Sequence, residues 1–269
     1  MMIRICNITR SFIITYLSLK TALVLISVLV STCFISLAAS GFFDYSVSER
    51  DVNAVSMTNR YYNSFFAMVS SIFTFVIVFS IALNFNKSSN NSSDYMYLTG
   101  GVSRKSFLTA KLLGVVVINA LLFLLLAVLV SSISVFFNIS FFEWNIFLTV
   151  ITHGLNSTLL CLLAVFLVML SRSSLVGCLP IIAYYLYNIF YSSARYSNDY
   201  INIVDSGVYK ISNALLPVFT YKPFDITNAN EYTYLFNLNL EPHFGIAYFV
   251  GYLIILSIIS VYIYSSKDL

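Results

Sequence analysis

The residue types that could support catalysis are few in this sequence, and they are widely spaced. There are two histidines, His153 and His243, and four cysteines that show no paired spacing. The sequence contains no GxxxxGK(S/T) loop for nucleotide phosphates, no GxSxG nucleophile turn and no HExxH zinc helix. We therefore expect the chain itself to be no enzyme, and to hold no metal or cofactor. Any nucleotide hydrolysis it depends on must occur on another polypeptide.

The polar side chains that could act inside a membrane are neutral. His153, Asn156, Ser157 and Thr158 form one group within the segment THGLNST, and Asn119 belongs to an earlier apolar run. Such side chains usually hydrogen-bond to a neighbouring helix, for about 1 kcal/mol each. Two interpretations of Asn119, His153 and Asn156 therefore stay open, namely helix packing and a polar patch on the path of a cargo.

Six apolar segments must position these residues. The 269-residue chain is 59% hydrophobic and 9% charged, whereas a soluble domain carries about 25% charged residues. The segments lie near residues 21–40, 64–84, 112–137, 146–170, 175–191 and 244–264. Each could cross about 30 Å of hydrocarbon as a helix. The sequence therefore predicts an all-α polytopic membrane protein with six spans and a single transmembrane domain, residues 1–269.

The six segments contain no Asp, Glu, Lys or Arg. A transporter that couples to ions usually carries at least one such group at mid-membrane. This absence favours a membrane path that is driven mechanically over one that is driven by protons.

The distribution of Lys and Arg predicts that both termini are cytoplasmic. In that orientation the inside segments hold nine cations and the outside segments five. The nine are Arg4, Arg10, Lys20, Lys87, Arg104, Lys105, Lys111, Arg172 and Lys267. Residues 1–20 mix apolar and cationic side chains, which predicts a helix lying in the membrane interface, with a disordered basic leader as the alternative.

The overall charge and composition bear on partners and location. The net charge of +3 without a basic block gives no sign of nucleic-acid binding. Frequent Asn, Ile, Tyr and Phe indicate an AT-rich genome, and we expect a bacterial plasma membrane as the location. The first span follows Arg4, Arg10 and Lys20 and so invites comparison with a signal peptide, but its apolar run is long enough to be a retained span.

The long inside connection, residues 85–111, has the pattern of a docking element. Residues 95–99 would form a short apolar helix that Gly100 and Gly101 end. Ser103 would cap a second helix, which starts at Arg104 and continues into the third span. The element comprises Tyr95, Met96, Tyr97, Leu98, Gly100, Gly101, Ser103, Arg104 and Lys111. Anchoring by positive charge explains the cations of this connection, but not an apolar helix beside two glycines.

At these residues the chain resembles the permease subunits of type-2 ATP-binding-cassette exporters. Their first inside loop carries a coupling helix followed by a small-x-Ser-Arg pattern and, further on, Lys-x-apolar-Gly. Here the segment 102–104 reads Val-Ser-Arg, and the segment 111–114 reads Lys-Leu-Leu-Gly. The likeness extends to the six-span plan with both termini inside. It implies that cytoplasmic ATP-binding-cassette ATPase subunits bind the 95–99 helix and hydrolyse the ATP.

The resemblance also bears on the long outside connection, residues 192–243. The family often has a short re-entrant helical hairpin before the last span, and residues 214–219 would fall in it. Leu216, Pro217 and Phe219 would then belong to an outer gate. A surface cap without gating is the alternative. Residues 209–219 are apolar enough to dip back into the membrane.

The resemblance implies a transport function without fixing the cargo. Two copies of the chain, or one copy and a homologous permease, would enclose a path in the lipid bilayer and export an amphipathic or hydrophobic cargo, such as a peptide, a drug-like compound or a lipid-linked molecule. The alternative is a non-transporting membrane protein, such as an immunity or assembly factor that acts by sequestration.

Overall fold

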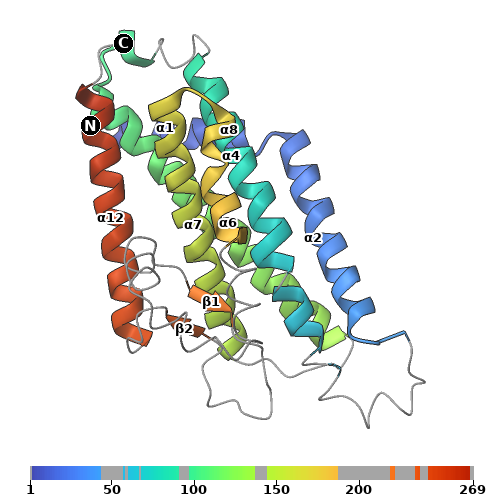
Figure 1. Ribbon diagram of the computed structural model, residues 1–269. Coiled ribbons are helices and arrows are strands. Elements are labelled where there is room, and N and C mark those ends of the chain that lie inside the picture. Colours follow the sequence, from blue (N-terminus) through green and yellow to red (C-terminus); the bar gives the residue numbers. More distant parts are fainter. Residues whose placement is uncertain are drawn as a thin grey trace.

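The computed structural model describes residues 2–43, 57, 60–66, 68–90, 97–136, 144–186, 219–221, 234–236 and 242–266. This part of the chain is mostly helical, as predicted (Figure 1). Its elements are α1 (Met2–Tyr16), α2 (Leu19–Ala39), the π-helix η1 (Val69–Phe73), α4 (Thr74–Asn90), α6 (Arg104–Phe136), α7 (Trp144–Ser171), α8 (Ser174–Gly177), β1 (Phe219–Tyr221), β2 (Tyr234–Phe236) and α12 (Pro242–Ser266). Further helical segments are 60–66, 97–99 and 179–186.

Several of these helices have the length and composition of membrane spans. In the described part of the chain, three are long and apolar enough to cross a membrane: Lys20–Ala39, Arg104–Ser132 and His153–Ser171. Large apolar side chains also cover the outer faces of the helices; for example, Leu124 is 66% exposed and Ile258 is 63% exposed. Helices that face lipid carry such a surface, because hydrocarbon solvates apolar side chains. These features are those of a helical membrane protein.

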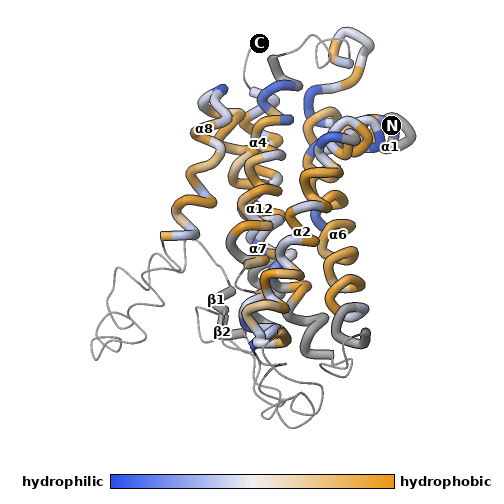
Figure 2. The backbone as a smooth tube through the Cα atoms, turned by 90° about the vertical axis from the view of Figure 1, so that its right-hand side faces the viewer, coloured by the Kyte–Doolittle hydropathy of each residue, from blue (hydrophilic) through white to orange (hydrophobic). Residues whose placement is uncertain are grey.

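The long helices run up and down beside one another, while α1 lies across one end of the bundle (Figures 1 and 2). We call this the α1 end. Helices α2 and α6 begin there, and α4, α7 and α12 finish there, so the N- and C-terminal helical residues lie at the same end (Figure 1). Hydrophobic residues fill the middle of the bundle, and hydrophilic residues gather toward the α1 end (Figure 2).

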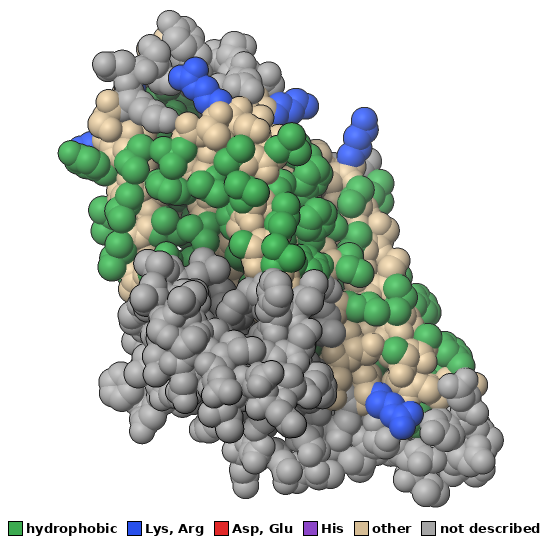
Figure 3. All heavy atoms as spheres, viewed as in Figure 1, with side chains coloured by type: hydrophobic (Ala, Val, Ile, Leu, Met, Phe, Trp, Pro, Cys, Tyr) green, Lys and Arg blue, Asp and Glu red, His purple; other side chains and the backbone are tan. Residues whose placement is uncertain are grey.

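The Lys and Arg residues that the structure describes are also concentrated toward the α1 end. At the α1 end, Arg10 lies within α1, and further cations lie near helix ends or in a turn, namely Lys20, Lys87, Arg104, Lys105, Lys111 and Arg172. Arg60 begins a helical segment at the other end. Figure 3 shows blue Lys and Arg side chains mainly at the α1 end of the visible face, above a wide hydrophobic belt. The sequence-based count of cations assumed this division, with more Lys and Arg at the end that holds both termini, and from it predicted that this end is cytoplasmic.

Helix α1 is amphipathic. Ile8, Phe12 and Tyr16 are buried and recur every four residues, whereas Arg10 and Ile14 are exposed. This spacing places the buried residues on one face of a helix. The predicted helix within residues 1–20 is therefore present, and its buried face packs on α6.

The second and fifth predicted spans contain irregularities. The π-helix η1 precedes α4, and the hydroxyl of Thr74 donates a hydrogen bond of 2.8 Å to the carbonyl oxygen of Val69. Between α8 and the 179–186 helix the chain forms a turn at Cys178. Pro180 explains this break, because its ring crowds the carbonyl four residues earlier and it has no N–H to donate.

The predicted tight turn between the fourth and fifth spans is present. Helix α7 ends at Ser171 and α8 begins at Ser174. Arg172 has a φ of 54°, which reverses the chain direction without glycine.

The chain also has two short strands, which the all-α prediction did not include. β1 and β2 form an antiparallel pair in which Phe219 lies opposite Phe236 and Tyr221 opposite Tyr234. Phe219 is therefore a strand residue, and its assignment to a helical hairpin was wrong. Extended backbone satisfies its hydrogen bonds only with a partner strand, and the sequence pattern did not identify one. Leu216 and Pro217 lie outside the described residues.

Candidate functional site

The segment between α4 and α6 contains a helical turn that glycine ends. Residues 97–99 are helical, and Gly101 has a φ of 80°. The N–H of Gly101 donates to the carbonyl oxygen of Leu98 at 3.3 Å, and the N–H of Val102 donates to that of Tyr97 at 3.4 Å. This pair of bonds is the Schellman motif, in which glycine takes the left-handed position that other residues avoid. The sequence-based prediction that the two glycines stop a short helix is confirmed for these residues. We call residues 97–101 the 97–101 turn.

Ser103 caps the helix that follows. Its hydroxyl oxygen accepts a hydrogen bond of 3.3 Å from the backbone N–H of Ser106, and its hydroxyl donates to the Ser106 hydroxyl oxygen at 2.8 Å. Helix α6 then runs from Arg104 to Phe136 without interruption. At 1.5 Å per residue its 33 residues extend about 50 Å. The 97–101 turn is thus joined by two residues to a helix that runs the whole length of the bundle.

The turn rests on α1 and on the first turns of α6. The hydroxyl of Tyr97 donates to the hydroxyl oxygen of Ser11 at 3.1 Å. The rings of Tyr97 and Phe107 lie 5.8 Å apart. Leu98 packs against a small buried cluster that includes Ile8 and Phe107. The turn therefore contacts two helices and is not an isolated loop.

Helix α1 is itself attached to α6 at two levels. The hydroxyl of Thr9 donates to the carbonyl oxygen of Ala110 at 3.0 Å. One turn further along, the ring of Phe12 lies over Gly114, so closely that a Cβ at that position would stand 2.6 Å from Cδ1 of the ring. Gly114 is therefore required by the close approach of α1. This is a physical reason for the glycine in the Lys-Leu-Leu-Gly segment.

Lys111 lies inside the same region. Its side chain is 4% exposed, and its Nζ lies 5.0 Å from the ring centroid of Phe85 and 4.7 Å from that of Phe107. An ammonium over an aromatic face is attracted by the ring electrons. Because Phe85 is on α4 and Phe107 is on α6, Lys111 holds together the two helices that flank the turn. In this arrangement it cannot touch an outside partner, so its part in the predicted element is to position the helices.

The other residues of the predicted docking element differ in exposure. Tyr97 is 37% exposed, and Gly100, Gly101 and Ser103 are also exposed. Leu98 and Arg104 are half-buried. Tyr95 and Met96 lie outside the described residues. An outside partner can therefore reach the turn through Tyr97, Thr99 and the two glycines.

Sequence reasoning missed three contributors to this site, Thr9, Ser11 and Phe12. All three lie on α1. Thr9 and Phe12 are about one hundred residues away in sequence from their contacts on α6, and Ser11 is about ninety residues away from its contact in the turn. The only available signal was the four-residue spacing of Ile8, Phe12 and Tyr16, which predicts a buried face but not what covers it.

The polar residues inside the bundle pack helices together. The side-chain amide of Asn119 donates to the carbonyl oxygen of Val115 at 3.1 Å, and its oxygen accepts a hydrogen bond of 2.9 Å from the Ser157 hydroxyl. His153 is buried and stacks on Phe66, with ring centroids 5.5 Å apart. Asn156 is also buried. These contacts fit the interpretation of helix packing, and Asn119 ties α6 to α7.

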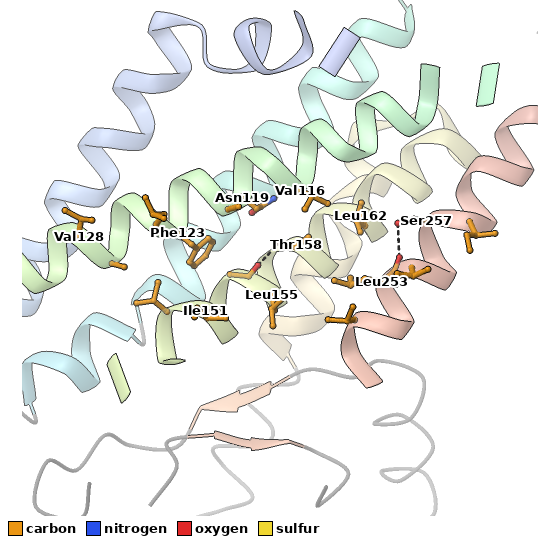
Figure 4. Close-up of a pocket in the computed structure, with 18 residues that line it drawn as sticks. Val116, Asn119, Phe123, Val128, Ile151, Leu155, Thr158, Leu162, Leu253 and Ser257 are labelled. Carbon is orange, nitrogen blue, oxygen red and sulfur yellow. Dashed lines mark hydrogen bonds between the residues drawn. The ribbon is translucent and has the colours of Figure 1, made fainter. Parts of the chain in front are cut away.

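A groove lies between α6, α7 and α12, beside the contact of Asn119 with Ser157. Its main hollow has a volume of about 800 Å³ and is lined almost wholly by apolar residues, among them Phe123, Leu155 and Leu253 (Figure 4). Asn119, Thr158 and Ser257 contribute its polar side chains. The hydroxyls of Thr158 and Ser257 donate to carbonyl oxygens of their own helices, each at 2.8 Å (Figure 4).

Comparisons with protein-family models, with curated proteins and with solved structures found no match to this chain.

Proposed function

We propose that this chain is the membrane-spanning permease subunit of an ATP-binding-cassette exporter. In this proposal the helices cross a bacterial plasma membrane six times, with the α1 end in the cytoplasm. The observation that carries the proposal is the 97–101 turn, an exposed helical turn that is ended by a Schellman motif and joined through the Ser103 cap to α6.

The turn has the mechanical properties that coupling to a separate motor requires. A force applied at Tyr97 passes to α1 through the Ser11 hydroxyl and to α6 through Phe107 and the capped helix start. Because α6 is continuous over 33 residues, a displacement at the α1 end moves the helix at the other end as well. Flexible loops lose such a displacement, whereas packed helices transmit it.

The proposed motor is a pair of cytoplasmic ATPase subunits that grip the turns of two permeases. The two permeases are two copies of this chain, or one copy and a homologous partner. ATP binding shifts the permeases between membrane states only if the ATPases bind these states with different affinity. The 97–101 turn is fixed to α1 and α6, so it moves when these helices move. The ATPases would therefore meet the turn in a different position in each membrane state, and this gives the difference in affinity.

An apolar or amphipathic cargo suits this bundle. The described parts of the long helices present apolar side chains outward, and their buried polar groups are engaged in packing. The six predicted apolar segments contain no Asp, Glu, Lys or Arg that could compensate a strongly charged cargo, and burying an unpaired charge is costly. The cargo is therefore proposed to be a hydrophobic peptide, a drug-like compound or a lipid-linked molecule.

Co-purification tests this proposal. The full-length chain is expressed with a candidate cytoplasmic P-loop ATPase, and the amount of ATPase retained is measured for the original chain, for Tyr97→Ala and for Lys87→Ala. Lys87 is exposed at the same end of the bundle but lies on α4 outside the turn, so it serves as the matched control.

We expect Tyr97→Ala to lower ATPase retention and Lys87→Ala to preserve it, while both variants insert into the membrane at the original level. Equal retention by both variants would contradict the assignment of the turn. Failure of every candidate ATPase to bind would favour the non-transporting membrane factor.

A further inference from the structure

The groove between α6, α7 and α12 continues toward the α1 end. A second hollow of about 290 Å³ adjoins the main one, and the two share Val116, Ser257 and Ile258. The second hollow reaches Thr109, close to the start of α6. At 1.5 Å per residue, the stretch of α6 from Thr109 to Val128 is about 28 Å long, close to the thickness of a bilayer's hydrocarbon core. We call the two hollows together the α6–α12 groove.

The lining of this groove suits a hydrocarbon chain better than a peptide. The hydroxyls of Thr158 and Ser257 are already bonded to their own helices, and the Asn119 side chain is bonded to Val115 and Ser157. The groove therefore has few free hydrogen-bonding groups among the side chains that the structure describes. An extended peptide in the groove would leave its backbone N–H and C=O groups unpaired, which is costly in hydrocarbon. An acyl chain has no such groups.

A positive charge stands at the cytoplasmic mouth of the groove in the proposed orientation. Lys105, Thr109, Val116, Ala120 and Phe123 follow one another at intervals of three, four or seven residues, so they share one face of α6. The hydroxyl of Thr109 donates to the carbonyl oxygen of Lys105 at 2.8 Å, which places Lys105 one helical turn beyond the end of the groove. The Lys105 side chain is exposed.

The surroundings of this mouth are also cationic. The first turn of α6 carries Arg104 as well as Lys105. Basic sites at the cytoplasmic ends of membrane helices attract anionic lipid headgroups.

We propose that the α6–α12 groove binds one anionic phospholipid of the membrane, with its phosphate beside Lys105 and an acyl chain along Thr109, Val116 and Ala120. This lipid site depends on the membrane location and the proposed orientation of the chain, and not on the proposed transport. A second copy of the chain is the competing occupant, and the test separates the two.

Native mass spectrometry of the purified full-length chain measures this site directly. The protein in detergent is titrated with phosphatidylglycerol or with phosphatidylcholine of the same acyl chains, and the bound lipids are counted. We expect the original chain to prefer phosphatidylglycerol. Lys105→Gln should reduce that preference by about fivefold, as expected from about 1 kcal/mol for one basic side chain near an anionic headgroup. Lys87→Gln, which removes a charge away from the groove, should leave the preference unchanged.

A second variant pair tests the acyl-chain part of the site. Ala120→Trp places a large ring in the groove and should lower the binding of both lipids, whereas Val30→Trp on the exposed face of α2 should not. Equal binding of the two lipids by the original chain, equal effects of Lys105→Gln and Lys87→Gln, or undiminished lipid binding by Ala120→Trp would each overturn the proposal. A dimer mass that Ala120→Trp removes would assign the groove to a second copy instead.

Discussion

Replacing Gly114 by alanine adds a methyl group where α1 crosses α6. The new Cβ would lie 2.6 Å from Cδ1 of Phe12 and 3.4 and 3.5 Å from two further atoms of the ring. Phe12 is 8% exposed and belongs to the main buried cluster, so its ring cannot simply swing away. Overpacking of this kind costs about 1–3 kcal/mol.

The net effect must also include helix propensity. Alanine is better than glycine in a helix interior by about 1 kcal/mol. Gly251→Ala is the matched control, because a Cβ at Gly251 meets nothing within 4 Å. Both variants gain the same propensity, and the difference between them isolates the contact with Phe12. We expect Gly114→Ala to be less stable than Gly251→Ala by about 1–3 kcal/mol.

The assay is thermal unfolding of the purified chain in detergent. At about 2–4 °C per kcal/mol, the expected gap in Tm between the two variants is roughly 2–12 °C. Adding Phe12→Leu should reduce the cost of Gly114→Ala, since the smaller side chain makes room for the methyl group. Equal Tm values for Gly114→Ala and Gly251→Ala, or no rescue by Phe12→Leu, would refute the assignment of the α1–α6 contact.

Three further substitutions test the capped turn and the packing of α6 on α7. Gly101→Ala should destabilise the chain by about 1–2 kcal/mol, because alanine at a φ of 80° is strained although no atom obstructs it; thermal unfolding would measure this, and Gly101→Asn should cost less. Ser103→Ala should cost about 1 kcal/mol through loss of the helix cap, whereas Ser103→Asp should retain stability; an unchanged Tm for Ser103→Ala would argue against the cap. In a double-mutant cycle, Asn119→Ala and Ser157→Ala should couple by about 0.6 kcal/mol, the average for such bonds between membrane helices; simple additivity would mean that their hydrogen bond contributes nothing to stability.

The local parts of the candidate site could be predicted from the sequence. Gly101 and Ser103 mark the end of one helix and the start of the next, and both effects act over a few residues. The helical segments in the six apolar stretches were also predictable, because a long apolar run in lipid can satisfy its backbone only as a helix.

Contacts between distant segments could not be predicted in the same way. The bond between Tyr97 and Ser11 joins residues 86 positions apart, and nothing in either local pattern indicates the other. The fit of Phe12 over Gly114 depends on how α1 crosses α6. The placement of Lys111 over two rings likewise depends on where α4 ends, so the sequence alone placed Lys111 in the docking element, with anchoring by positive charge as the alternative.

The short strands were missed for a related reason. Phe219 and Phe236 pair across a long connection, and three-residue strands give too short a pattern to be distinguished from an apolar helix. Similarly, composition does not reveal the π-helix Val69–Phe73 or the hydrogen bond from the Thr74 hydroxyl to the Val69 carbonyl oxygen that accompanies it.

Site-specific photocross-linking from position 97 in living cells tests whether the 97–101 turn binds a cytoplasmic ATPase. A photoreactive amino acid replaces Tyr97 in one strain and Arg60, at the opposite end of the bundle, in another. We expect position 97 to cross-link to a cytoplasmic protein whose peptides contain a GxxxxGK(S/T) loop, and position 60 not to do so. Cross-linking of that ATPase from position 60, or no such product from position 97, would refute the proposal that the 97–101 turn couples the bundle to an ATPase.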